Sequence, residues 1–245
     1  MKIHKVTNIE QFVTKILPKQ PQKNKSIVES ILKNVQKNGD SAVKKYEKKF
    51  TGASISTLRV SVTEIKNAYS KVSKNEITAL RIAKTRVEKT EFTVKTIFKD
   101  KKINHDGVQI LKKFIPIPSI GCYIPGGLAK YPSSVIMSVI PAKVAGVKRI
   151  VVVSPPNSNG KIDPLTIVAA DICGATEIYK TGGVQAIGAL SYGTKSISKV
   201  DKIVGPGGAF VTLAKSLVND NTGIDMLAGP TELGIIADNS VNPEF

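Results

Sequence analysis

Cysteine, histidine, arginine and tryptophan are all scarce in this sequence. Two cysteines among 245 residues cannot form a disulfide framework, and their separation of 51 residues is not the spacing of a metal site. No apolar run reaches the ~18–20 residues of a membrane span, and the N-terminus shows neither the apolar core nor the small-residue cleavage site of a secretory signal. These absences favour a cytoplasmic protein without a membrane partner.

Positive charge and glycine are distributed unevenly along the chain. Hydrophobic residues make up 41% of the sequence, which excludes wholesale disorder. The net charge is +17, and residues 1–120 hold 26 basic and 10 acidic residues, whereas residues 121–245 hold 10 and 9. Glycine shows the opposite bias, with three in the first part and sixteen in the second. The chain therefore has two unlike halves, and it is long enough to bury a sizeable core.

The basic half raises the question of nucleic-acid binding. Its lysines are spread singly or in pairs among acidic and apolar residues, and the whole chain has four arginines and no basic–aromatic motif of an RNA-recognition module. We therefore favour a solvated, lysine-rich helical surface and expect no nucleic-acid partner. A nucleic-acid-binding protein is the alternative, and its affinity would fall steeply with salt.

The first half has the pattern of helices followed by a hairpin. Apolar residues at helical spacing predict a helix with Ser26 as N-cap and Gly39 as its stop, and a second helix over residues 73–91. The β-branched segments 92–98 and 108–117 predict two strands of a hairpin that turns at His105-Asp106-Gly107. Nothing in this half indicates a catalytic site.

The second half alternates short apolar runs with amphipathic segments. Four such β-loop-α units follow one another in about 100 residues, and each apolar run ends in Gly or Pro. Strands with nearly continuous Val and Ile content, alternating with helices, predict a parallel sheet that is covered on both faces. We therefore expect an α/β protein with a Rossmann-like domain.

Three glycine-rich loops follow predicted strands of this sheet. They are Gly126-Gly127, Gly182-Gly183 and Gly205-Pro206-Gly207-Gly208. In parallel sheets ligands bind beyond the carboxyl ends of the strands, where backbone N–H groups at helix N-termini can approach an anion or a ring. The G-x-G-x-x-G fingerprint is absent, so the alternative is that these glycines only permit tight turns.

Three polar residues near these loops are candidates for ligand contact. Tyr123 and Gln185 each fall at a strand or helix end on the binding edge, and Thr231 follows the turn-forming Gly229-Pro230. For a single Tyr or Gln, a surface or capping role is the usual alternative.

The cysteines and histidines are weaker candidates. Cys122 and Cys173 lie among Ile and Ala, so packing is a better explanation for them than nucleophilic catalysis. His4 and His105 lie in the basic half, outside any cluster of Cys, His, Asp or Glu, so neither is a convincing zinc ligand or general base.

Several motifs occur in order along residues 121–245: YIPGG, YPSSVIMSVIPAKVAGV, VVSPP, TGGVQAIGALSYGT, KVDKIVGPG, GIDMLAGPTE and NPEF. Together they closely resemble the histidinol dehydrogenase family. The first 120 residues agree with that family by length and helical character only. Several separate motifs in the right order are far more specific than a single short pattern.

The resemblance implies an activity and a set of contacts. It implies oxidation of L-histidinol through L-histidinal to L-histidine, the last steps of histidine biosynthesis, with NAD and zinc, by a homodimer. It places NAD contacts on Tyr123, Gln185 and Gly208 and a substrate contact on Thr231. Two of these residues depart from the family pattern, which has Asn at the position of Gly208 and Ser at that of Thr231. The lost Asn amide removes a directional hydrogen bond to the cofactor, whereas Thr retains a hydroxyl.

The resemblance also implies a domain organisation. Residues 1–120 would be the helix-rich first part of a discontinuous α/β domain, residues 121–228 the inserted Rossmann-like NAD-binding domain, and residues 229–245 the start of the returning first domain. The family's zinc ligands and its catalytic Glu-His pair follow NPEF, so we expect them beyond Phe245. We therefore expect no catalytic or metal-binding residue in this chain and no activity from it alone. The alternative is a catalytically dead nucleotide-binding or regulatory module.

Overall fold

The structure is a computed structural model that describes residues 6–16, 22–126, 130–227, 238 and 240–242. The helices are α1 Ile9–Ile16, α2 Gln22–Thr51, α3 Val62–Tyr69, α4 Lys74–Lys95, α5 Pro132–Ala145, α6 Pro164–Cys173, α7 Gly183–Tyr192 and α8 Ala209–Val218. The strands are β1 Lys101–His105, β2 Val108–Lys112, β3 Ser119–Tyr123, β4 Arg149–Ser154, β5 Glu177–Lys180, β6 Lys202–Val204 and β7 Gly223–Ile224.

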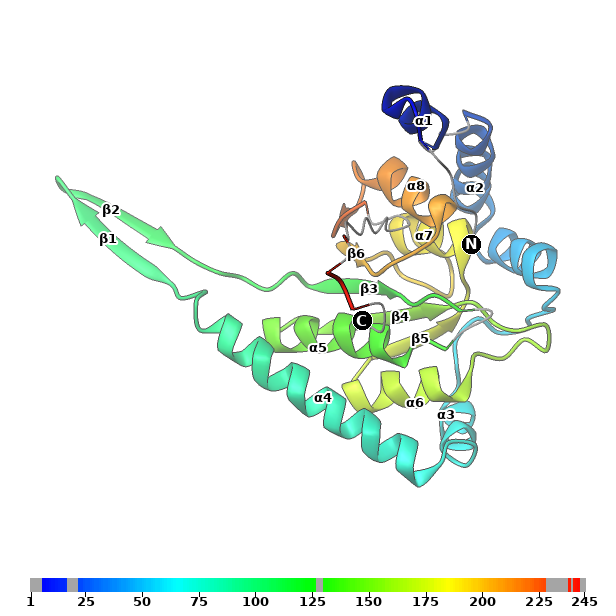
Figure 1. The fold of residues 1–245 in the computed structure, drawn as a ribbon. Coiled ribbons are helices and arrows are strands. Elements are labelled where there is room, and N and C mark those ends of the chain that lie inside the picture. The colour runs from blue at the N-terminus through cyan, green and yellow to red at the C-terminus, as the bar shows by residue number, and fades with distance from the viewer. Residues whose placement is uncertain (1–5, 17–21, 127–129, 228–237, 239, 243–245) are drawn as a thin grey trace.

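Strands β3 to β7 form one parallel sheet in the order β5-β4-β3-β6-β7. The four predicted β-loop-α units are β3-α5, β4-α6, β5-α7 and β6-α8 (Figure 1). This confirms an α/β fold with a Rossmann-like sheet that follows a helix-rich N-terminal region. The sequence did not predict β7, because a strand of two residues is too short to show a pattern.

The outer edge of β5 is covered by a segment from the N-terminal half. Val60 N–H donates to Ile178 O at 2.8 Å, and Lys180 N–H donates to Leu58 O at 2.7 Å. The bridge between them, Arg59 with Tyr179, is antiparallel. The N-terminal half therefore takes part in the sheet itself, and the backbone groups of β5 are not left as an open edge.

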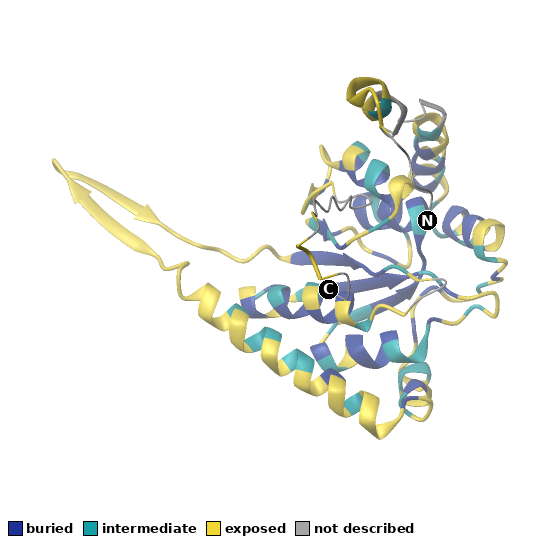
Figure 2. Ribbon diagram, viewed as in Figure 1, coloured by how far each residue is buried: buried dark blue, intermediate teal, exposed yellow. Residues whose placement is uncertain are grey.

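Helices cover both faces of the sheet because its central strands are apolar on both sides. Along β3 and β4, Ile120, Cys122 and Val152 contribute to one buried cluster, while Tyr123 and Val153 contribute to the other. This is the two-residue alternation of a strand. Helices α5 and α6 cover the first face, and α7 and α8 cover the second (Figure 2).

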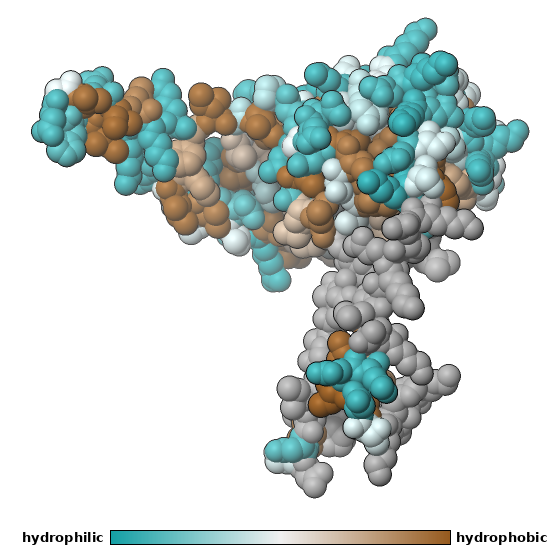
Figure 3. Space-filling model, turned by 90° about the horizontal axis from the view of Figure 1, so that it is seen from above, coloured by the Kyte–Doolittle hydropathy of each residue, from teal (hydrophilic) through white to brown (hydrophobic). Residues whose placement is uncertain are grey.

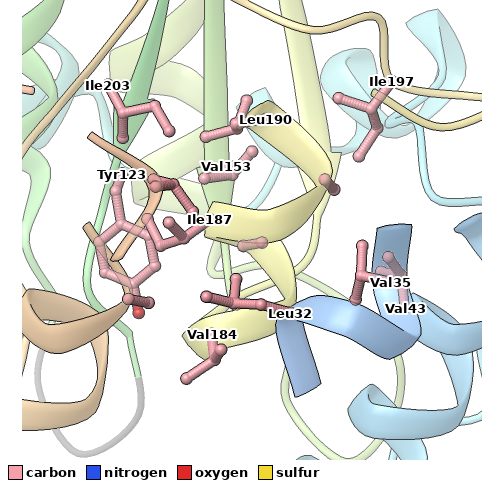
Figure 4. Packing of buried hydrophobic residues seen from close by; sticks show 14 of the residues in the cluster. Leu32, Val35, Val43, Tyr123, Val153, Val184, Ile187, Leu190, Ile197 and Ile203 are labelled. Carbon is pink, nitrogen blue, oxygen red and sulfur yellow. The ribbon is translucent and has the colours of Figure 1, made fainter. Parts of the chain in front are cut away.

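Helix α2 adds a further layer over α7. Its residues Leu32, Val35 and Val43 share a cluster with Val184 and Ile187 of α7 (Figure 4). A face of the Rossmann-like sheet is thus completed by a helix from the basic half.

The predicted start of this helix is wrong, but its predicted break is confirmed. Helix α2 begins at Gln22, so Ser26 lies inside the first turns and is not the N-cap. At Gly39 the backbone leaves the helical region, with φ 51° and ψ −132°, and two helices meet there at a kink. Glycine takes this conformation without the steric penalty that other residues have.

Helix α4 begins as predicted but is longer. Ser73 is the N-cap and forms a reciprocal capping box with Glu76. The helix continues to Lys95, so the strand predicted over residues 92–98 is wrong. Packing of α4 against α5, and the bond from Lys95 Nζ to Val144 O at 2.8 Å, outweigh the strand preference of the β-branched residues.

The predicted hairpin turn is confirmed and lies at the tip of a projection. Strands β1 and β2 pair in antiparallel register, and the turn is formed by Asp106 with φ 49° and Gly107 with φ 80°. We call residues 97–117 the arm. It leaves the body at the amino end of β3, and every residue of β1 and β2 is exposed (Figures 1 and 2). In the described part of the chain, no helix combines the length and apolar character needed to cross a bilayer.

Candidate functional site

Glycines of all three predicted loops lie at the carboxyl edge of the sheet, as predicted, while Gly127 lies outside the described residues. A Cβ added at Gly126 would lie 2.8 Å from Pro155 Cγ, and one added at Gly182 would lie 2.5 Å from Pro155 Cβ. A Cβ at Gly205 would collide with the carbonyl oxygen of Tyr123. These contacts bring the ends of β3, β4, β5 and β6 together. The chain order reverses between β3 and β6, which is where Rossmann-like sheets bind ligands.

Two of the predicted cofactor residues meet at the N-terminus of α7. The Tyr123 hydroxyl accepts a hydrogen bond from Gly183 N–H at 3.2 Å, and Gln185 lies in the first turn of the same helix. Both side chains are buried, and burial raises the pKa of the Tyr123 hydroxyl. Figure 4 shows the Tyr123 ring beside Ile203 and Ile187, which belong to the same core cluster, so packing fixes the position of the ring.

Glu47, a residue of α2, joins the same loop and was not predicted as a site residue. Its Oε1 accepts hydrogen bonds from Thr181 Oγ1 at 2.8 Å, Gly182 N–H at 2.9 Å and Gln185 Nε2 at 2.7 Å. Burial raises the pKa of Glu47, and the three donors oppose that effect only in part. In the sequence Glu47 is one acid among four lysines, and no local pattern marks it as buried.

Beside this network lies a cavity of about 760 Å³ between α2 and the loop after β5. Its walls are largely apolar, with some polar side chains that include Glu47 and Gln185. Phe210, in the first turn of α8, lines it from the side of the Gly205 loop. A mainly apolar cavity with a few convergent polar groups is typical of cofactor sites.

Gly208, the third predicted contact, is the N-cap of α8. Among the described residues, no side chain caps this helix N-terminus, and a Cβ at Gly208 would meet no atom within 4 Å. As far as the described residues go, the space beside the loop has room for a ligand or for a larger side chain. At Gly207, in contrast, a Cβ would collide with Val211 of α8.

An ion pair between a buried lysine and a partly exposed aspartate holds the Gly205 loop. Lys215 of α8 is 1% exposed, pairs with Asp225 and donates to Gly205 O at 3.1 Å. Asp225 Oδ2 accepts from Gly205 N–H at 2.8 Å. The pair thus bonds to both the N–H and the carbonyl oxygen of Gly205. Neither Lys215 nor Asp225 was predicted from the sequence as a site residue.

The other candidate residues do not lie at this site or are not described. Thr231 and His4 lie outside the described residues. His105 lies at the tip of the arm, beside Asp106, at the opposite end of the sheet from the glycine loops. Cys122 and Cys173 are free and buried, and burial raises the pKa of each thiol to about 12, which supports a packing role. Over the described ranges, no group of three or more His, Cys, Asp or Glu could hold a metal ion.

Comparison with known proteins gives a consistent assignment. The family model for histidinol dehydrogenase matches residues 17–245. A histidinol dehydrogenase of Methanococcus maripaludis is 49% identical over 219 residues, which are 89% of this chain and 51% of the relative. One from Clostridium acetobutylicum is 42% identical over 240 residues, 96% of this chain and 55% of the relative.

A solved structure agrees with the sequence relatives. The crystal structure of histidinol dehydrogenase from Elizabethkingia anophelis superposes with a TM-score of 0.86 at 39% identity and covers 93% of this chain and 52% of that one. The chain spans about half the length of the curated relatives it matches. The family match, the identities and the shared fold agree, and the chain belongs to the histidinol dehydrogenase family.

Proposed function

We propose that the protein oxidises L-histidinol through L-histidinal to L-histidine with NAD as hydride acceptor, and that this chain supplies its cofactor-binding part. The observation that carries the proposal is the meeting of Tyr123, Gln185 and the Gly205 loop at the edge where the chain order reverses. The family membership supplies the reaction class.

The described residues fit a dinucleotide. Helices α7 and α8 begin at the sheet edge, after their N-caps Gly182 and Gly208, and a helix N-terminus suits phosphate oxygens. At α7 the Gly183 N–H is already bonded to the Tyr123 hydroxyl, so the N-terminus of α8 is the better phosphate site. Buried oxygen atoms of Glu47 and Gln185 lack partners among the described residues, and the adjoining cavity is large and apolar. NAD would supply the acceptor for the hydride. The chain's own residues would bind it, orient it and exclude water from it.

The described residues do not fit zinc, because they contain no suitable group of ligands. We therefore assign no step through zinc to this chain, although zinc belongs to the proposal for the whole protein. Oxidation of an alcohol also needs a base for the hydroxyl proton. His105 is placed on the arm, away from the glycine loops, so we propose that residues 1–245 alone do not oxidise L-histidinol.

The experiment that tests this proposal has two readings on the purified 245-residue chain. NAD is titrated by calorimetry, and NAD reduction is followed with L-histidinol and zinc present. We expect binding without turnover. Absence of NAD binding would contradict the cofactor site, and zinc-dependent turnover would contradict the assignment of proton transfer to other residues.

We also propose a homodimer in the cytoplasm with L-histidinol as its small-molecule partner. The arm supports self-association, because it exposes a run of large apolar side chains (Figure 3): Ile97, Phe98, Ile103, Val108, Ile110, Leu111, Phe114 and Ile115. By the register of the hairpin, Ile103, Val108 and Ile110 lie on one face, and exposed apolar surface of this kind marks interaction sites. The division into residues 1–120, 121–228 and 229–245, and a substrate contact by Thr231, stay predictions.

A further inference from the structure

Two buried oxygen atoms at the glycine loops have no hydrogen-bond partner among the residues that the structure describes. They are Glu47 Oε2 and Gln185 Oε1. The exposed fractions of these two residues are 0% and 2%. Buried acceptors are nearly always paired in folded proteins, so two unpaired ones on neighbouring side chains call for an explanation.

The hydrogen-bond network fixes which way both groups face. Glu47 Oε1 already accepts from Thr181, Gly182 and Gln185, so all three local donors are directed to one carboxylate oxygen. A carboxylate oxygen such as Glu47 Oε1 can only accept a hydrogen bond, so the Gln185 amide presents its NH₂ group to Glu47. The amide oxygen, Gln185 Oε1, is therefore turned away from this carboxylate oxygen. Two acceptors are therefore left over together, one on each side chain.

Both side chains line the cavity between α2 and the loop after β5. Pro155, Val184 and Phe210 also line the cavity and offer no side-chain donor. Donor side chains of α2 line it as well, but none of them bonds to either oxygen: Ser26, Ser30, Tyr46, Lys49 and Thr51. A ligand group with hydrogen-bond donors would satisfy both acceptors, whereas an anionic substituent would be repelled by the Glu47 carboxylate.

We infer that Glu47 is a specificity-determining residue of the cofactor site and that it forms, with Gln185, a subsite that accepts hydrogen bonds from a donor-bearing group of the dinucleotide. The inference rests on the proposed NAD site. The donor groups of NAD are the carboxamide, the adenine amino group and the ribose hydroxyls, and the subsite selects for one of them.

The Glu47→Gln variant tests this with almost no change of shape. Its carbonyl oxygen retains the three donors, so its NH₂ group replaces Oε2 and turns an acceptor into a donor. We expect the Kd for NAD, measured by calorimetry, to rise about tenfold, because two donors would then face each other. The thermal midpoint should not fall, since the variant also removes a buried charge.

Glu177→Gln is the matched control. It makes the same chemical change at the amino end of β5, where Glu177 bonds to Arg149 and Tyr179. We expect this variant to lose stability without a change in the Kd for NAD. Equal weakening of NAD binding in both variants would mean that Glu47 acts only through the stability of the fold, and would overturn the inference.

Three analogues test the subsite in the unchanged protein. Nicotinic acid adenine dinucleotide, nicotinamide hypoxanthine dinucleotide and NADP each replace one donor group of NAD by an acceptor or an anion. At least one should bind about tenfold more weakly than NAD, and Glu47→Gln should reduce that difference. If all four bind within about twofold of each other, or if Glu47→Gln leaves NAD affinity unchanged, the inference is wrong while the cofactor site stands. No binding of NAD by the unchanged chain would overturn both.

Discussion

Gly208 leaves the N-terminus of α8 without a side-chain cap, and no other described residue fills the space where its Cβ would lie. Its φ of −69° and ψ of 176° are accessible to any residue. We expect Gly208→Asn to tighten NAD binding by up to about tenfold, because the amide adds a directional hydrogen bond. Titration of NAD against both proteins measures this. Unchanged or weaker binding with a normal thermal midpoint would show that the Asn contact of the family is not available in this loop.

Gly205, in contrast to Gly208, is a position that only glycine suits. Its φ is 113°, and a Cβ would strike the Tyr123 carbonyl oxygen of the neighbouring strand. We expect Gly205→Ala to lower the free energy of unfolding by about 2 kcal/mol or more and to abolish NAD binding, since backbone strain and a collision add together. Urea unfolding and the NAD titration check both effects. Gly208→Ala, where the Cβ has room, is the control and should retain at least most of the stability.

The residues of this site that were predicted from the sequence are those that belong to a local pattern. Tyr123 and Gln185 follow from the positions of strand and helix ends, and the loop at Gly205 follows from its glycines. Glu47 lies 138 positions before Gln185, and only the packing of α2 on α7 brings them together. Its burial depends on that tertiary contact, which no spacing in a single sequence reveals.

At the scale of elements, the pair Lys215–Asp225 connects α8, the loop after β6 and β7. Burial raises the pKa of Asp225, but hydrogen bonds from Lys215 and from two backbone N–H groups outweigh it, so the pKa lies below 3.8. An acid whose pKa is lower in the folded state stabilises the fold at pH values above its pKa in the unfolded chain. This stabilisation is lost as the pH falls through the pKa of the folded state. At neutral pH Asp225 is therefore ionised, and the bonds from Lys215 and Asp225 to the Gly205 loop are present.

We expect Lys215→Met to lower the free energy of unfolding by about 1–3 kcal/mol at pH 7, because Asp225 loses its partner while water reaches only part of its carboxylate. The difference between the variant and the parent should shrink below about pH 4, where Asp225 becomes protonated in the variant. Urea unfolding at several pH values measures this. A difference that does not depend on pH would mean that lost packing of the Lys215 stem, and not its charge, is responsible.

The errors in predicting elements have a common physical cause. The segment 92–98 has β-branched residues and favours a strand locally, yet most of it extends α4, which packs on α5. Ser26 suits an N-cap, yet α2 begins four residues earlier. In contrast, Ser73 and the turn at Asp106-Gly107 were located correctly, because a capping box and a hairpin turn depend on neighbouring residues only.

For the whole molecule, the arm supports a prediction about self-association. Ile103 and Ile110 are paired across β1 and β2 and are both exposed. If the arm mediates dimer formation, Ile110→Lys should convert a species of twice 26.3 kDa into a monomer in light scattering. Gln109→Lys adds the same charge to the opposite side of the hairpin and should leave the dimer intact. A monomeric parent chain, or a dimer that Ile110→Lys does not affect, would place any interface elsewhere.

The packing of α2 on α7 has a consequence for synthesis on the ribosome. Helix α2 ends at Thr51 and α7 begins at Gly183, so the two halves of one core are made 132 residues apart. At about 5–20 residues per second, roughly 7–26 s pass between the synthesis of the end of α2 and the start of translation of α7. During this interval Leu32, Val35 and Val43 have nothing from α7 to cover them. The nascent chain should therefore be a substrate for ribosome-associated chaperones until α7 emerges.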